Sequence, residues 1–114
     1  MLLEVMKKNE EALLAYEKAE RVLLANEVYD DLLYKKGRIQ LKLGKFNDAA
    51  NTFLVLQGAA GEGMWKEESY FYYAKCLYNL KDDNAQQATE QYLLKYPGGF
   101  YYEQARLMYR TFDL

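Results

Sequence analysis

The chain has 114 residues, of which 51% are hydrophobic, and a formal net charge of -2 from 15 basic and 17 acidic residues. This length suits one compact unit with a core of its own, and the composition excludes a disordered or collagen-like chain. The near-balance of charge gives no basic surface for nucleic acid, and the absence of histidine removes the commonest general base and metal ligand. We therefore expect no catalytic site, no cofactor, no metal and no nucleic-acid partner.

Strong helix formers dominate the sequence, and few residues interrupt them. We predict helices over residues 2–25, 28–43, 46–57, 64–80, 84–96 and 100–113. Glycine-containing breaks at 58–63 and 97–99, with weaker ones at 44–45 and 81–84, separate these segments. No segment alternates with period two over a length that would argue for a strand. The predicted fold class is all-α.

The first residues carry no visible targeting signal. Residues 1–4 lack the basic region followed by an apolar stretch that begins a signal peptide, and every apolar run is far shorter than a membrane span. Cys76 is the only cysteine, so it forms no internal disulfide and leaves the redox compartment open. We expect no membrane insertion, and both an envelope (periplasmic) and a cytoplasmic location stay open.

The helices repeat in register about every 37 residues. Three segments share a small residue followed by larger ones at +4 and +7: Ala12, Tyr16 and Ala19; Ala49, Phe53 and Leu56; Ala85, Thr89 and Tyr92. The helices between them share another pair of positions: Leu33 and Gly37; Tyr70 and Ala74; Leu107 and Thr111. Residues spaced in this way lie on one face of a helix. The register predicts helix pairs stacked in series, because such units bury their apolar faces only against neighbours.

Segment 33–61 resembles a tetratricopeptide repeat through Leu33, Gly37 and the turn LGKFNDAANTF, which ends at Phe53. Segment 70–97 is similar, with a turn shorter by about one residue. The resemblance implies an α-solenoid of antiparallel helix pairs in a right-handed superhelix. Residues 1–25 would be the second helix of a partial repeat, 28–61 and 64–97 whole repeats, and 100–114 a terminal helix. Any other α-solenoid or a helical bundle is the less specific alternative.

Three residues depart from the repeat pattern, and one stretch resembles a particular subgroup of repeat proteins. Lys36 and Gln40 stand where the family prefers leucine and tyrosine, and Thr89 replaces an aromatic residue, so individual repeats are expected to be weaker. The stretch QYLLKYPGGFYYEQARL, residues 91–107, is similar to the long-linker repeats of bacterial envelope proteins. These include the Tol-Pal-associated periplasmic protein and the outer-membrane assembly lipoprotein. Proteins of the RNA-binding pentatricopeptide class need a basic groove, and the net charge of this chain argues against one.

The resemblance implies a concave surface lined by the first helix of each pair. By register, the residues there are Tyr34, Lys35, Arg38, Leu41 and Lys42, then Phe71, Tyr72, Lys75, Tyr78 and Asn79, then Met108. Aromatic and basic side chains suit a peptide with apolar anchors and some acidic character. We therefore predict a non-catalytic scaffold that binds a peptide or a partner domain. The competing interpretation is that the aromatics pack between helices and the cations are solvated. The family's two-carboxylate clamp is matched only in part at Arg38 and Lys75, and its ligand is not predicted.

Self-association, as part of a larger envelope or signalling protein, is the structural alternative. Both ends of the stack look open, and the last helix would expose Leu107, Met108, Phe112 and Leu114 unless they are covered. The glycine loop before Trp65 lacks the Gly-Lys-Ser/Thr ending of a phosphate-binding loop, so we interpret it as a linker that the Trp65 ring pins. Cys76 is expected to be a small buried residue. Residues 67–68 and 82–83 are interpreted as helix-start charges.

Overall fold

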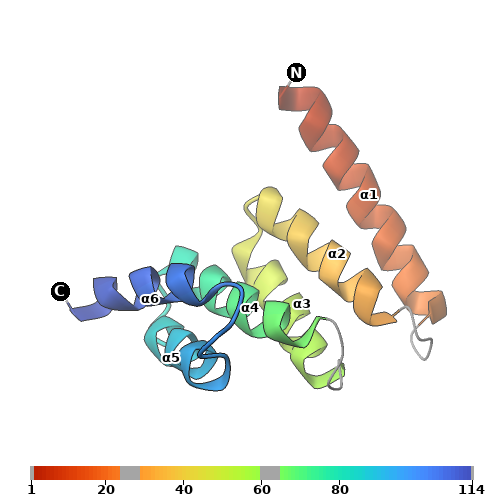
Figure 1. Cartoon of the computed structure of the whole chain (residues 1–114). Coiled ribbons are helices and arrows are strands. Elements are labelled where there is room, and N and C mark those ends of the chain that lie inside the picture. Colours follow the sequence, from red (N-terminus) through yellow and green to blue (C-terminus); the bar gives the residue numbers. More distant parts are fainter. Residues whose placement is uncertain (1, 24–28, 60–64, 114) are drawn as a thin grey trace.

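The computed structural model of this chain describes residues 2–23, 29–59 and 65–113 (Figure 1). Six α-helices make up these ranges: α1 (Leu2–Leu23), α2 (Tyr29–Lys42), α3 (Phe46–Ala59), α4 (Lys66–Leu80), α5 (Ala85–Lys95) and α6 (Tyr102–Arg110). A 3-10 turn, Thr111–Asp113, follows α6. The ranges contain no strand, which confirms the all-α prediction. The expected helix ends at 24–25 and 28, most of the glycine loop, and Leu114 lie outside the described residues.

The last helix is shorter than predicted, and the turn before it explains why. Residues 96–102 form successive turns, in which the Gly99 amide donates to the Tyr96 carbonyl and the Tyr102 amide donates to the Gly99 carbonyl. The helix therefore begins at Tyr102 rather than at residue 100. Its end tightens where the Thr111 hydroxyl donates to the Met108 carbonyl at 2.7 Å.

Helices that follow one another in the chain pack against one another. In this way α3 packs against α2 and α4, α5 packs against α4 and α6, and α1 packs against α2. Figure 1 shows α1 reaching beyond the other helices, and among the described side chains of α1 only that of Leu13 is buried. The core therefore lies between α2 and α6.

The repeated register corresponds to the buried face in two of its three copies. In α3 the residues Ala49, Phe53 and Leu56 are buried, and in α5 the same holds for Ala85, Thr89 and Tyr92. In α1 the counterparts Ala12 and Tyr16 are only half-buried, and the side chain of Ala19 is outside the described set. The +4 and +7 spacing thus identified the faces of α3 and α5 that enter the core.

Gln40, one of the departures from the repeat pattern, is a buried and satisfied polar residue. The Thr52 hydroxyl of α3 donates a hydrogen bond of 2.6 Å to its side-chain oxygen. A buried amide without a partner would cost free energy, and Thr52 supplies the partner. The polar substitution therefore joins α2 to α3 instead of leaving an unpaired group in the core.

Candidate partner-binding site

Five aromatic rings from separate parts of the chain meet beside α2 and α4. We call this set the aromatic cluster: Tyr34, Trp65, Phe71, Tyr72 and Tyr101. Tyr34 of α2 stacks on Trp65 with the ring centroids 3.9 Å apart, and Phe71 of α4 stacks on Tyr101 at 4.4 Å. Tyr72 lies between these stacks, edge-on to Tyr34 at 6.2 Å and to Tyr101 at 5.6 Å. The cluster therefore joins α2, α4 and the residue that precedes α6.

Arg38 lies over this cluster. Its guanidinium carbon is 4.8 Å from the Tyr72 ring centroid and 5.7 Å from that of Tyr34, and its Nη1 donates to the Tyr34 hydroxyl at 2.7 Å. Burial lowers the pKa of Arg38, but the oxygens of Tyr72 and Tyr34 more than offset this, so the pKa is raised. Within the described ranges no carboxylate pairs with it. The site thus holds a fixed, half-buried cation that no carboxylate of the described residues neutralises.

Glu68, in the first turn of α4, brings a half-buried carboxylate to the same cluster. Burial raises its pKa, the charge of Glu67 raises it further, and a backbone hydrogen bond acts in the opposite direction. Its charge also raises the pKa values of Tyr34 and Tyr101, for which burial is the larger cause. Ionised groups held in unfavourable surroundings are common at functional sites.

The structure brings together only part of the predicted concave lining. Tyr34, Arg38, Phe71, Tyr72 and Lys75 gather at the aromatic cluster, where the Lys75 ammonium lies 5.9 Å from the Phe71 ring centroid. Tyr78 lies further along α4 and packs edge-on to Phe112 at 5.7 Å. Leu41 and Met108 are partly buried against the core, and Lys42 and Asn79 are exposed.

Two members of the predicted lining need correction. Phe71 is 1% exposed and Tyr72 is 7% exposed, so neither presents a contact area to a partner. The reason is that Tyr101 covers Phe71 and Arg38 covers Tyr72, contacts that helical spacing does not reveal. Lys35 is exposed and forms an ion pair of 2.9 Å with Asp31 one turn earlier, a surface pair of small energetic value.

Sequence reasoning missed Tyr101 and assigned Trp65 and Glu68 to other tasks. Trp65 stacks on the Tyr34 ring. The expectation that it pins the glycine loop falls mostly on residues 60–64, which lie outside the described residues. Tyr101 lies in the run YPGGFYY, which is rich in aromatic residues. Because this run forms turns, no helical period indicates which of its rings faces inward. The position of these residues depends on the helix junctions rather than on the register.

A hydrogen-bond network fixes the junction that carries Tyr101. The Glu67 carboxylate accepts from the Tyr92 hydroxyl at 2.7 Å and from the Phe100 amide at 2.6 Å. The Tyr92 oxygen in turn accepts from the Tyr101 amide at 2.9 Å. A Cβ atom on Gly99 would lie 2.6 Å from that oxygen, so the close approach needs glycine. Glu67 is at a helix start as predicted, but it also ties α4 to α5 and to the start of α6.

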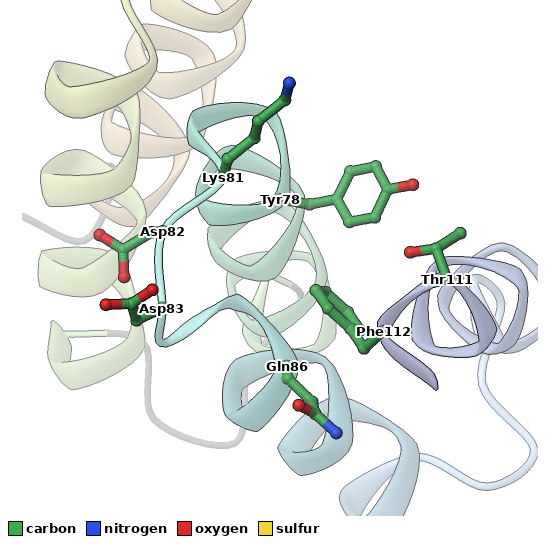
Figure 2. Close-up of a pocket in the computed structure, with 7 residues that line it drawn as sticks. All are labelled: Tyr78, Lys81, Asp82, Asp83, Gln86, Thr111 and Phe112. Carbon is green, nitrogen blue, oxygen red and sulfur yellow. The ribbon is translucent and has the colours of Figure 1, made fainter. Parts of the chain in front are cut away.

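A pocket of about 460 Å³ lies at the opposite end of α4, between the α4–α5 turn and the 3-10 turn (Figure 2). Seven residues line it: Tyr78, Lys81, Asp82, Asp83, Gln86, Thr111 and Phe112. Figure 2 shows Tyr78, Thr111 and Phe112 near one another, whereas Asp82 and Asp83 point away from them. Asp82 accepts from the Asn84 amide at 2.8 Å and so serves the start of α5. The two carboxylates therefore do not converge on a ligand with the aromatic rings.

Over the described ranges the chain is thus all-helical, with an aromatic cluster over which Arg38 lies, and no described carboxylate pairs with that guanidinium. Comparison with family models, with curated proteins and with solved structures gives no match for this chain. Among the helices described here, none has the length and apolar character needed to cross a membrane. Across the same residues, no three His, Cys, Asp or Glu side chains are grouped as metal ligands would be.

Proposed function

We propose that the chain is a solenoid of antiparallel helix pairs of the tetratricopeptide kind and acts as a non-catalytic scaffold. Two features support the helix pairs: the repeated register of about 37 residues, and the burial of equivalent residues in α3 and α5. In this arrangement 28–61 and 64–97 are whole repeats, 1–25 is a second helix and 100–114 is a terminal helix. The concave face is then the one formed by α2, α4 and α6.

The partner we propose is a protein segment or peptide that carries a carboxylate and at least one apolar side chain. Arg38 carries this proposal, because its guanidinium is fixed by Tyr34 and Tyr72 and has no carboxylate of its own within the described ranges. A planar guanidinium that is already held in place loses little freedom when it binds a carboxylate. Lys75 supplies a second cation on the neighbouring helix.

Apolar contact is available at the edge of the same surface. Phe100 is 86% exposed, its ring lies 5.2 Å from that of Tyr101, and its backbone amide is held by Glu67. A large apolar side chain on a fixed backbone gives contact area at a low cost in entropy. The surface therefore offers a cation at Arg38 and an apolar anchor at Phe100.

Peptide binding to purified protein tests this proposal directly. Trp65 is the only tryptophan and stacks on Tyr34, so its fluorescence reports on the surface without a label. Peptides of equal apolar content, acidic or neutral, would be titrated into wild type, Arg38→Gln and Arg106→Gln. Arg106 provides the matched control, because it is exposed and, among the described residues, pairs with its helix neighbour Glu103 at 3.0 Å.

We expect the acidic peptides to bind more tightly than the neutral ones, and Arg38→Gln to raise their dissociation constant by about tenfold or more. Arg106→Gln should leave it unchanged. Equal binding of acidic and neutral peptides, or equal effects of the two substitutions, would show that Arg38 is a packing residue and not a contact residue.

Self-association is the second candidate function, and a different observation favours it. Leu107 on α6 is 56% exposed although its register counterpart Leu33 is 1% exposed. Leu114, expected to contribute to the same apolar end, lies outside the described residues. Sedimentation at several concentrations separates a monomeric scaffold from a chain that associates with itself.

A further inference from the structure

A groove runs over α4 between α3 and α5, on helices from the middle of the described chain. Two neighbouring pockets form it, of about 230 Å³ and about 370 Å³, and Gln91 of α5 lines both. From α4 the groove is lined by Leu77, Tyr73 and Tyr70. Each of α3, α4 and α5 packs against the helix before it and the helix after it. None of the lining residues belongs to the aromatic cluster, so the groove is separate from the Arg38 surface.

Carboxamide side chains make up most of the polar lining of this groove. They come from Gln57 of α3 and from Asn84, Gln87 and Gln91 of α5. Among the described residues, the side chains of Asn84, Gln87 and Gln91 have no hydrogen-bond partner. That of Gln57 makes one long bond of 3.5 Å, to the Ser69 carbonyl. Because a carboxamide carries two N–H donors and an acceptor oxygen, the groove offers donors and acceptors along both of its walls.

Apolar side chains lie between these carboxamides. Leu77 and Ala88 are buried in the groove, and Tyr73 is half-buried. At the edges Leu54 of α3 is 48% exposed and Leu94 of α5 is 75% exposed. A ligand that combines polar groups with apolar side chains along its length therefore matches the lining.

One cation, Lys95, lies at the end of the groove where α5 ends. Its ammonium is 5.2 Å from the Tyr70 ring centroid, and no carboxylate of the described residues pairs with it. The larger part of the lining, in the pocket that reaches Asn84, carries no charge. A ligand with a neutral body and a single carboxylate at one end complements this distribution. A nucleic acid, with a phosphate on every nucleotide, does not.

We infer that the groove binds an extended, uncharged peptide segment that has an acidic residue at one end. An extended chain presents one N–H and one C=O per residue, and a carboxamide can bond to both, whereas a helix has already paired these groups internally. From Asn84 to Lys95, α5 rises by about 16 Å, which is the length of about five extended residues. Side chains on alternate residues then contact the apolar lining, and the acidic residue meets Lys95.

Nuclear magnetic resonance of the nitrogen-labelled chain tests this inference, because the side-chain amides of Gln87 and Gln91 give signals of their own. The probe is the peptide acetyl-Leu-Ser-Leu-Ser-Leu-Asp-amide, titrated to millimolar concentration. We expect it to shift these signals equally in wild type and in Arg38→Gln. Gln91→Met should raise its dissociation constant by about fivefold or more. Gln86→Met is the matched control and should leave it unchanged, because Gln86 is exposed on the same helix but lines the pocket at Phe112.

Two altered probes separate the backbone and the charge of the peptide. Methylation of the serine amide nitrogens removes backbone donors and keeps the side chains, so it should weaken binding by about fivefold or more. Asparagine in place of the aspartate should weaken binding to wild type by about threefold or more, and Lys95→Gln should abolish this difference between the two probes.

Several results would overturn the inference. These are groove signals that do not shift at millimolar peptide, equal effects of Gln91→Met and Gln86→Met, and equal binding of the methylated probe or of the asparagine probe. A response of the same signals to maltohexaose but not to the peptide would assign the groove to a carbohydrate and overturn it as well. Trp65 fluorescence reports on the Arg38 surface separately. Loss of that response to acidic peptides, with the groove signals still shifting, would reject the partner-binding proposal alone.

Discussion

The ring of Phe53 lies directly against the backbone of Gly37, and a Cβ atom on Gly37 would be 2.6 Å from Cζ of that ring. At the equivalent positions of the next helix pair, Ala74 and Thr89 are both buried. The second pair thus has a larger residue on the first helix and a smaller one on the second helix. A larger side chain on the first helix is thus matched by a smaller one on the second helix, so the two together fill a similar volume, as a closely packed core requires.

We predict that Gly37→Ala lowers the free energy of unfolding by about 1–3 kcal/mol, because the added methyl group forces the Phe53 ring to move. Chemical denaturation measures the change. Gly98→Ala is the control, since a Cβ there meets no atom within 4 Å, and it should change stability by less than about 0.5 kcal/mol. Adding Phe53→Leu to Gly37→Ala should cost less than the two single changes summed. Equal effects at Gly37 and Gly98 would contradict the packing argument.

The network at the α5–α6 junction gives a second prediction. Tyr92→Phe removes the hydrogen bond to Glu67 and the acceptor of the Tyr101 amide, so it should cost about 1–3 kcal/mol of stability. Tyr73→Phe is the control, because no hydrogen bond of its hydroxyl is found within the described ranges. A double-mutant cycle with Glu67→Gln should give a coupling energy clearly different from zero. Additive effects would mean that the two side chains do not act together.

The raised pKa of Glu68 predicts the direction in which the stability of the chain changes with pH. Because burial raises its pKa above the value in the unfolded chain, its contribution to stability is present below about pH 4.5 and is lost as pH rises through the folded-state pKa. Glu68→Gln should therefore be slightly more stable than wild type at pH 7, by less than about 1 kcal/mol given its solvent exposure, and equal to it at pH 3.

Denaturation at the two pH values measures this difference. Glu90→Gln, an identical change at an exposed site on α5, serves as the control. A Glu68→Gln variant that is less stable than wild type at pH 7 would show that the carboxylate supports the fold instead of costing stability.

The buried Cys76 thiol should be unreactive in the folded chain. Burial raises its pKa to about 12, so almost no thiolate forms at pH 8, and no surface is open to a reagent. A thiol reagent at pH 8 should label it only as fast as the chain unfolds, and at once in denaturant. The raised pKa also contributes to the free energy of unfolding: this contribution is fully present below pH 9 and is lost as pH rises toward 12. Cys76→Ala should reduce this loss. Rapid labelling of the native chain would contradict the burial of Cys76.

Much of the fold could be predicted from local pattern. The spacing of Ala49, Phe53 and Leu56 places them on one side of a helix whatever surrounds it, and all three are buried. Pro97 predicts the end of the fifth helix, because proline cannot continue the hydrogen-bond ladder, and α5 ends at Lys95. These features depend on residues within a few turns of one another.

The candidate site was predicted less well. The register placed Tyr34, Arg38 and Lys75 on one surface. In the structure Arg38 lies over the rings of Tyr34 and Tyr72, and Lys75 lies near the ring of Phe71. The register also placed Phe71 there as a contact residue, although Tyr101 covers it. A helical register identifies a face, but it does not show whether a later segment of the chain lies on that face.

By itself, the sequence determined the helices, the repeated register and the faces of α3 and α5 that enter the core, because each follows from the geometry of a single helix. Only the tertiary structure decided that Arg38 lies over Tyr72 and that Tyr101 stacks on Phe71. Those contacts depend on how the helices cross and on the turn that Glu67, Tyr92 and Gly99 hold. That turn forms through bonds between residues far apart in the chain, which local spacing does not encode.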